Sequence, residues 1–218
     1  MADIRDFKYE SNPPSSVEPE DLARYTYDEF QRVRDAITVT TRWDDLRFPA
    51  TAVNLDSAAT RYSFDTTDIA ISFANNARYT NEQLNFIIQL PHSWQEESAI
   101  KPHIHWIQNQ AAVPNWLIEY RVYNNGDLLP AFGTFGTLQS HAFTWSSGSL
   151  VQISSFPEID MTGFRASCIV DVKLWRDTLN TSAQFAGVDP VATAVLLKEF
   201  DSHYQIDSFG SAMEFVKR

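Results

Sequence analysis

Short alternating segments separated by turns are the feature that most constrains how this chain can fold. From about residue 59 onward, apolar and polar residues alternate or form short apolar runs, which is typical of β-strands. Turn-forming sequences such as Asn124-Asn125-Gly126 separate them, and no helical period lies between them. Because parallel strands need long crossovers, we predict an antiparallel β-sandwich or barrel. The predicted strands are residues 59–64, 67–73, 83–90, 100–108, 116–123, 141–145, 150–156, 166–175 and 192–206.

The first 40 residues have a different pattern. We predict that residues 1–18 form an extended arm, because Asn12-Pro13-Pro14 is incompatible with a helix. Pro19 stands where a helix can begin, and apolar positions then recur at helical spacing at Leu22, Thr26, Phe30, Val33 and Ile37. The sequence therefore predicts an anchoring arm and helix in residues 1–40, followed by a β-domain in residues 41–218. We expect the side chains of Trp43, Leu46 and Phe48 to pack into the core of that domain.

The predicted helix needs a partner, because a single amphipathic helix cannot bury its apolar stripe alone. It can pack on its own β-domain, on other copies of the chain, or on another protein. An arm and helix ahead of an all-β domain favours the last two alternatives. We therefore predict that Leu22, Phe30, Val33 and Ile37 form a trimer or anchoring contact.

Composition excludes several functional classes. The formal net charge is −11 and the basic residues are scattered, so we expect no nucleic-acid partner. Seven glycines are too few and too scattered for a phosphate-binding loop, and there is no Gly-x-Ser-x-Gly elbow. No apolar run approaches the roughly 20 residues that span a bilayer, and MADIRDFKYE does not resemble a signal peptide, so we expect no membrane partner. Cys168 stands in an apolar run and is predicted to be a buried, inert thiol.

The most specific candidate for a chemical site is the pair His103 and His105. Two histidines two residues apart on a strand share a face and can bind one metal ion, as in cupin-type sites. A cupin-like site would also need a glutamate about four residues after the second histidine, where this chain has Asn109-Gln110. A metal on a symmetry axis between subunits, and imidazoles hydrogen-bonded within or between subunits, are the alternatives. No spacing singles out a third ligand among Glu119, His92, His141 and His203.

We take hydrogen-bonded histidines as the default, and we expect no catalytic residue, no metal and no other cofactor. The acidic pairs Asp44-Asp45, Glu96-Glu97 and Glu158/Asp160 stand in predicted turns or linkers, where carboxylates are usually solvated. The segment Asp127–Thr137 reads as a contact loop, and its Phe132 and Phe135 form a candidate ligand site. These residues, with Trp94 and Trp145, could stack on sugars or line a subunit contact.

Four segments carry a resemblance to a known group. WDDLRFPATAV (43–53), QLPHSWQEESAIKPHIHW (89–106), WLIEYRVY (116–123) and YQIDSFGS (204–211) resemble small virion-associated proteins of tailed bacteriophages. The proline-rich arm and short helix are similar to the start of many phage fibre and adaptor proteins. Together these similarities imply a jelly-roll or tumour-necrosis-factor-like sandwich that is homotrimeric and mounted on the virion.

The function expected from this resemblance is structural. The chain would be a head or neck fibre, spike or decoration protein that contacts capsid, neck or tail proteins and is assembled in the host cytoplasm. One alternative is a receptor- or glycan-binding module of the phage tail, which would use the Asp127–Thr137 loop. Another is a cupin-like metalloenzyme built on His103 and His105. If these histidines lie at a subunit interface, falling pH would charge them and loosen the trimer.

Overall fold

The computed structural model describes residues 19–38, 42–52, 62–75, 83–137 and 148–207. The chain divides into two compact units, residues 1–42 and residues 43–218. The first unit contains one helix, α1 (Pro19–Thr38). The second is a body of β-strands with the short 3₁₀ helix η2 (Ala50–Ala52). The predicted strand 141–145, with His141 and Trp145, and the side chain of Ile37 lie outside the described residues.

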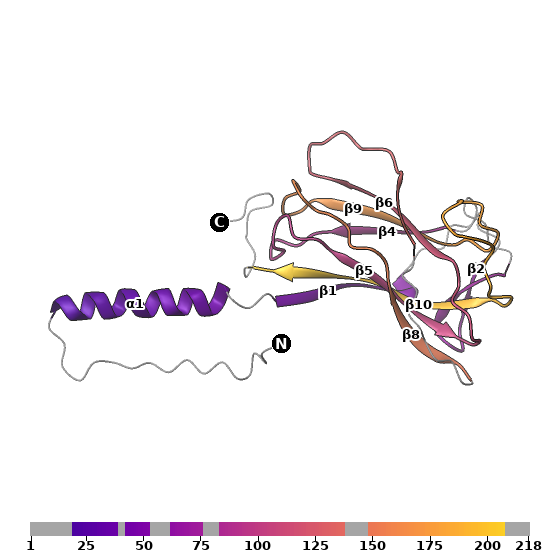
Figure 1. Cartoon of the computed structure of the whole chain (residues 1–218), viewed down its shortest axis with the longest axis horizontal. Helices are drawn as coiled ribbons and strands as arrows, with labels where there is room; N and C mark the ends of the chain where they lie inside the picture. The colour runs from indigo at the N-terminus through magenta and orange to yellow at the C-terminus, as the bar shows by residue number, and fades with distance from the viewer. Residues whose placement is uncertain (1–18, 39–41, 53–61, 76–82, 138–147, 208–218) are drawn as a thin grey trace. The chain divides into compact units, whose positions relative to one another are not determined.

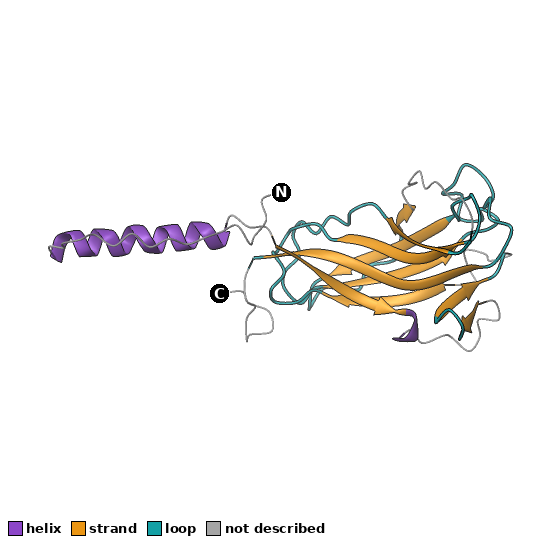
Figure 2. Ribbon diagram, turned by 90° about the horizontal axis from the view of Figure 1, so that it is seen from below, coloured by secondary structure: helices purple, strands orange, loops and turns teal. Residues whose placement is uncertain are grey.

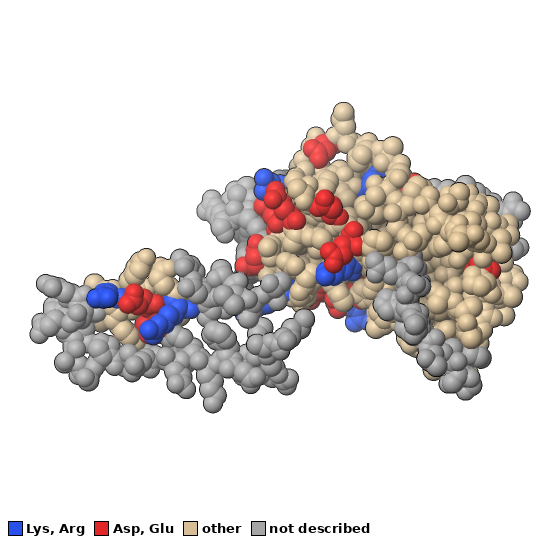
Figure 3. Space-filling view, viewed as in Figure 1, with Lys and Arg blue, Asp and Glu red and all other residues tan. Residues whose placement is uncertain are grey.

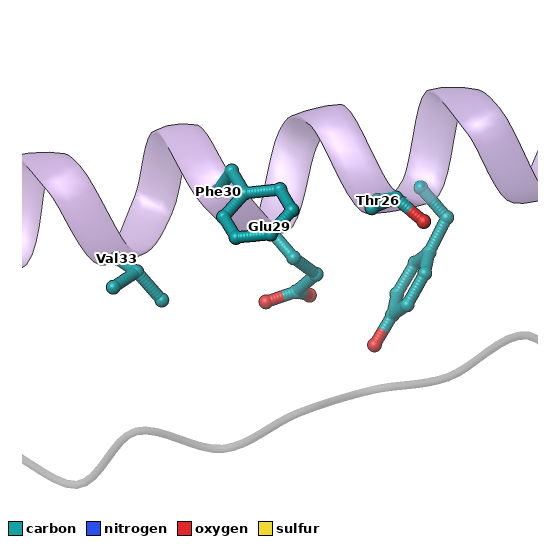
Figure 4. Close-up of a pocket in the computed structure, with 5 residues that line it drawn as sticks. Thr26, Glu29, Phe30 and Val33 are labelled. Atoms are coloured by element: carbon teal, nitrogen blue, oxygen red, sulfur yellow. The ribbon is translucent and has the colours of Figure 1, made fainter.

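Helix α1 begins at the proline predicted to open it. Val33 and Glu29 project from the same side of the helix, and the described residues that line a pocket there belong to α1 (Figure 4). Several large apolar side chains remain exposed: Leu22 by 52%, Tyr27 by 64%, Phe30 by 70% and Val33 by 37%. No helix in the described part of the chain combines the length and apolar character needed to cross a bilayer.

The body consists of two antiparallel sheets, so the predicted antiparallel β-sandwich is confirmed (Figure 1). The six-stranded sheet has the order β2-β3-β10-β5-β8, with β1 also paired to β10. Its strands are β1 (Arg42–Pro49), β2 (Tyr62–Asp65), β3 (Ala70–Phe73), β5 (Lys101–Gln108), β8 (Leu150–Ser155) and β10 (Val195–Ile206). The four-stranded sheet has the order β4-β9-β6-β7. Its strands are β4 (Gln83–Gln89), β9 (Ile169–Arg176), β6 (Trp116–Tyr123) and β7 (Thr134–Thr137). Figure 2 shows the long strands of the body running side by side.

Two strands differ from the sequence prediction. The last four residues of the predicted contact loop form β7, which pairs with β6 from Leu117 to Tyr120. The segment TFGT is too short and too glycine-rich to show an alternating pattern, so its strand conformation depends on the edge that β6 offers. Likewise, the charged segment at the start of the body forms β1 beside β10.

The core fills the space between the two sheets. Phe86 of β4 stacks on Phe200 of β10, with ring centroids 4.6 Å apart. Leu46 and Phe48 pack against this core as predicted. The prediction for Trp43 was wrong, because 39% of this residue is exposed. Successive side chains of a strand point to opposite faces, so odd-numbered Trp43 cannot share the inner face with even-numbered Leu46 and Phe48.

Charged side chains on the body are mixed in sign. On the face seen in Figure 3, acidic and basic groups adjoin one another, and neither sign forms a continuous area. A surface that binds a phosphate backbone concentrates lysine and arginine. The visible face has no such concentration.

Candidate functional site

Strand β10 changes the direction of its side chains part-way along its length. Leu197 and Phe200 both point into the core although they are three residues apart. The register with β5 shifts between Leu197 and Glu199, which makes Lys198 the extra residue of a β-bulge. A bulge re-aims the side chains that follow it. The residues turned away from the core are Glu199, Asp201 and His203.

Strand β5 supplies the histidines. Ile104 and Trp106 are buried in the core, and His103 and His105 alternate with them on the outer face, as the sequence predicted. The ring centroids of the two histidines lie 5.3 Å apart. Asp201 is the direct cross-strand partner of His103. The register therefore places a carboxylate beside the histidine pair.

These residues belong to a larger surface, which we call the histidine face. It consists of the side chains of four neighbouring strands, β1, β10, β5 and β8, that point away from the core. The contacts and registers of these strands assign to it Trp43, Asp45, Arg47, Lys101, His103, His105, Val151, Ile153, Glu199, Asp201 and His203. Val151 and Ile153 are more than half exposed, so β8 forms an open apolar margin.

Asp201 lies at the centre of the histidine face. Its Oδ2 is 3.7 Å from Nε2 of His103 and 4.0 Å from Nε2 of His105. Its Oδ1 accepts a hydrogen bond of 2.8 Å from the backbone amide of Ser202, which leaves Oδ2 directed at the imidazoles. One ligand atom from each of the three side chains lies within 4.8 Å of the other two. Asp201 and His103 are almost completely buried, whereas 25% of the His105 side chain is exposed.

Further charged groups surround this cluster. Arg47 donates to both carboxylate oxygens of Glu199, at 2.9 and 2.8 Å, and its Nε lies 3.8 Å from Oδ2 of Asp201. His203 contacts Oδ1 of Asp45 at 3.0 Å, and its ring centroid lies 4.4 Å from that of His103. The carboxylates of Glu199 and Asp45 and the guanidinium of Arg47 thus lie around the cluster.

The electrostatic environment disfavours an ion pair between His103 and Asp201. Burial lowers the pKa of His103 from its ordinary value, and the neighbouring His203 and His105 lower that pKa further. Burial also raises the pKa of Asp201, and the negative charge of Asp45 adds to that increase. Each group is pushed toward its neutral form although they are neighbours. The 3.7 Å separation between the two side chains is also too long for a hydrogen bond.

The third member of the cluster was not among the sequence candidates. Glu119 lies on the other sheet, 3.5 Å from Lys173, and His92 contacts the hydroxyl of Ser167 at 2.8 Å. Of the four candidates, His203 is the described residue that the fold brings beside the pair. The sequence does contain a pattern that indicates the direction of Asp201. The buried apolar positions of β10 have odd numbers up to Leu197 and even numbers from Phe200 onward, so beyond this change the odd-numbered residues point away from the core.

The candidate ligand loop lies on the four-stranded sheet. The ring of half-buried Phe132 has Nζ of Lys173 at 3.7 Å and Cζ of Arg121 at 4.3 Å from its centroid. Phe135 stands on β7 opposite Glu119. Trp94 is fully buried, so the expectation that it could stack on a sugar was wrong. The ring of Phe132 is thus in contact with two cationic side chains.

The acidic pairs contact groups of the protein itself. Asp44 accepts a hydrogen bond from the hydroxyl of Tyr204 at 3.0 Å, and Glu96 accepts one from the backbone amide of Ala166 at 2.8 Å. Glu158 lies 2.8 Å from Nζ of Lys101. Each of these three carboxylates therefore has a partner within the protein.

No family model matches the sequence, and no curated protein matches it. Among solved structures, the xylan-binding module CBM15 is 11% identical, over 78% of this chain and 95% of its own, with a TM-score of 0.35. TmCBM61, solved in complex with β-1,4-galactotriose, is 12% identical, over 73% of this chain and 86% of its own, with a TM-score of 0.28. Dimeric latent PorU from Porphyromonas gingivalis is 8% identical over 78% of this chain, which spans 13% of PorU, with a TM-score of 0.33. These values are too low to transfer a ligand or an activity.

Proposed function

We propose that the body is a non-catalytic recognition module that binds a glycan on the histidine face. The observation that carries this proposal is an exposed tryptophan beside a row of hydrogen-bonding side chains. Trp43 is 39% exposed, and Lys101 lies over its ring at 4.6 Å from the centroid. Tryptophan offers an apolar ring on which the C–H face of a sugar can stack.

The neighbouring side chains suit the hydroxyl groups of a sugar. Asp45 and His203 are each 44% exposed, and Lys101 is 42% exposed. Carboxylate oxygens accept hydrogen bonds, the lysine ammonium donates them, and an imidazole does either according to its protonation. A ligand site of this kind combines apolar area with a few placed polar groups. The face therefore offers both elements of sugar recognition.

The charge of the face selects among glycans. Among the described residues, Asp45, Glu199 and Asp201 stand together with the guanidinium of Arg47, while Lys101 is paired with Glu158. A ligand with a carboxylate or sulfate would be repelled by the excess negative charge. We therefore propose a neutral glycan.

The test is a glycan array probed with the full-length protein and with Trp43→Ala. We expect wild type to bind neutral glycans and Trp43→Ala to lose about tenfold or more in affinity, as for an aromatic hot spot. Phe132→Ala, on the other sheet, is the matched control and should bind as wild type. Equal thermal unfolding temperatures would show that both variants are folded. Absence of wild-type binding would overturn the proposal, and loss confined to Phe132→Ala would place the ligand at the loop instead.

A second function is favoured by a separate observation, the exposed apolar side chains of α1. We propose that α1 associates with α1 of other copies, as a trimer, and thereby mounts the body on a larger particle. A helix of 20 residues with exposed Leu22 and Phe30 gains stability by burying them against another surface. Sedimentation of wild type and of a Leu22→Ser/Phe30→Ser variant tests this: we expect a trimer that becomes a monomer.

The particle implied by the sequence resemblance is a tailed-phage virion, and this setting is part of the second proposal. Antibodies to the body should label intact virions in electron micrographs, on the head, neck or tail. Virions assembled with a chain that lacks residues 1–42 should not be labelled. Labelling that persists without the helix would contradict the proposed role of α1.

A further inference from the structure

We propose that His103, His105 and Asp201 form a binding site for a first-row transition-metal dication such as Zn²⁺. This inference goes beyond the proposed recognition function and does not depend on glycan binding. It assigns an ion site and no reaction. The observation behind it is the convergence of two imidazoles and one carboxylate oxygen on one side of the six-stranded sheet.

The donor set is appropriate for such an ion. Two histidines and one carboxylate are a recurrent ligand set for first-row transition metals, whereas Mg²⁺ and Ca²⁺ prefer oxygen ligands alone. Oδ2 of Asp201 lies 3.7 Å from Nε2 of His103 and 4.0 Å from Nε2 of His105. With metal–ligand bonds of about 2.0–2.2 Å, tetrahedral ligand atoms are roughly 3.3–3.6 Å apart. The two distances from Asp201 thus exceed this separation by less than about 1 Å, and all three ligand atoms lie within 4.8 Å of one another, so rotations about the side-chain χ angles can bring them to an ion.

The cluster is held in place by groups that do not bind the ion. The backbone amide of Ser202 fixes Oδ1 of Asp201 and leaves Oδ2 for the metal. Hydrogen bonds of this kind to the distant oxygen of a carboxylate orient metal ligands in proteins. The β-bulge at Lys198 gives Asp201 its outward direction, and register with β5 puts it opposite His103. Backbone structure rather than a flexible side chain therefore positions the carboxylate.

The local charge favours a dication. Among the described residues, Asp45, Glu199 and Asp201 contribute three carboxylates, and Arg47 contributes a guanidinium that lies against Glu199 and Asp201. When these carboxylates are ionised and the imidazoles are neutral, the four charged groups leave two negative charges uncompensated, which matches the charge of one divalent ion. His105 is the most exposed of the three ligands, with a quarter of its side chain accessible, so the ion enters from that side. A water molecule can complete the coordination there.

The experiment uses the full-length chain without a polyhistidine tag. The protein is treated with EDTA, dialysed and incubated with Zn²⁺. After unbound zinc is removed, the zinc bound per chain is measured by inductively coupled plasma mass spectrometry. We expect one zinc per chain for wild type and a zinc-dependent rise in thermal unfolding temperature. Incubation with Co²⁺ should give visible d–d absorption bands that report nitrogen and oxygen ligands.

Two variants and one control decide the assignment. Asp201→Asn and His105→Ala should each lower zinc affinity at least about tenfold and abolish the zinc-dependent thermal shift. His92→Gln, which changes a histidine outside the cluster, should bind zinc as wild type. Because His105 is partly exposed, its alanine variant should fold even if Asp201→Asn does not. Wild type that retains no zinc, or both variants binding as tightly as wild type, would overturn the inference.

Discussion

Arg176 and Asp189 form an ion pair in which neither side chain has any exposure to solvent. Nε of Arg176 lies 2.9 Å from Oδ2 of Asp189. The other guanidinium nitrogens donate to the backbone carbonyls of Phe73, Ala74, Val191 and Thr193. Asp189 in turn accepts from the backbone amides of Asn115 and Val191. One buried guanidinium thus joins the end of β9, the end of β3 and the segment that leads into β10.

Removing one partner of this pair should strongly destabilise the protein. Arg176→Met or Asp189→Asn leaves the other group buried without its counter-charge, and the expected cost is about 3–5 kcal/mol in the free energy of unfolding. Urea titration followed by tryptophan fluorescence measures it. The control is Arg165→Gln, which breaks an ion pair whose arginine side chain is 62% exposed and should cost less than about 1 kcal/mol. Equal small costs at both positions would contradict the role of the buried pair.

The thiol of Cys168 should be unreactive in the folded protein. Burial raises its pKa to about 12, so at pH 8 only about one thiol in ten thousand is a thiolate. We expect no measurable reaction with Ellman's reagent in buffer and reaction of one thiol per chain in concentrated guanidinium chloride. Cys168→Ala supplies the blank. Rapid labelling of native protein would show that the thiol is accessible.

Stability should fall as the pH decreases from 7.5 to 5.5, in part because of His103. Since its folded pKa lies below the ordinary value of about 6.5, the unfolded chain binds more protons than the folded chain in this range, and acid favours unfolding. The groups that face His103 are His105 on the same strand, Asp201 and His203 on β10, and Asp45 on β1.

His103→Gln should reduce this pH dependence, measured as the difference in the free energy of unfolding between the two pH values. Asp201 acts in the opposite direction: because its pKa is raised, the folded state binds its proton more readily, and stability is gained as the pH falls through that raised value. Comparing wild type with His103→Gln isolates the histidine contribution. Identical pH dependence of stability in the two proteins would contradict the predicted contribution of His103.

The body should fold without the arm and helix. The described core cluster and the hydrophobic residues packed against it lie between Leu46 and Ile206, all within the second unit. A chain of residues 43–218 should therefore unfold cooperatively at a temperature within a few degrees of the full-length protein. Circular dichroism measures this, and gel filtration reports its mass. An unfolded fragment would show that residues 1–42 are needed for folding of the body.

Deleting Lys198 should leave the body folded, because Lys198 is the extra residue of the β-bulge. After the deletion, Leu197 and Glu199 are consecutive opposite Trp106 and His105, so the strand keeps its register with β5, and Glu199, Asp201 and His203 still point away from the core. Lys198→Ala keeps the backbone count and removes only the side chain, which donates to the carbonyl of Asp68, and it should also fold. Thermal unfolding and soluble yield compare the two variants with wild type. A deletion variant that does not fold would contradict the assignment of Lys198 as the extra residue.

Much of the secondary structure follows from local patterns. Alternation predicts β5 and places His103 and His105 on one face, because a strand turns each successive side chain over regardless of its neighbours. The period of Leu22, Phe30 and Val33 predicts α1 in the same way. Short segments without a period, such as β7, are not predictable, because their conformation depends on the strand beside them.

What the sequence alone determined is therefore most of the strands, the helix and the shared face of the histidine pair. What only the tertiary structure decided is which carboxylate stands beside that pair. Asp201 is far from His103 along the chain, and the two meet because β10 pairs with β5 after one bulged residue. Strand pairing is chosen by closure of the whole core, and a shift of one residue would turn every following side chain to the other face. No local pattern around His103 contains that information.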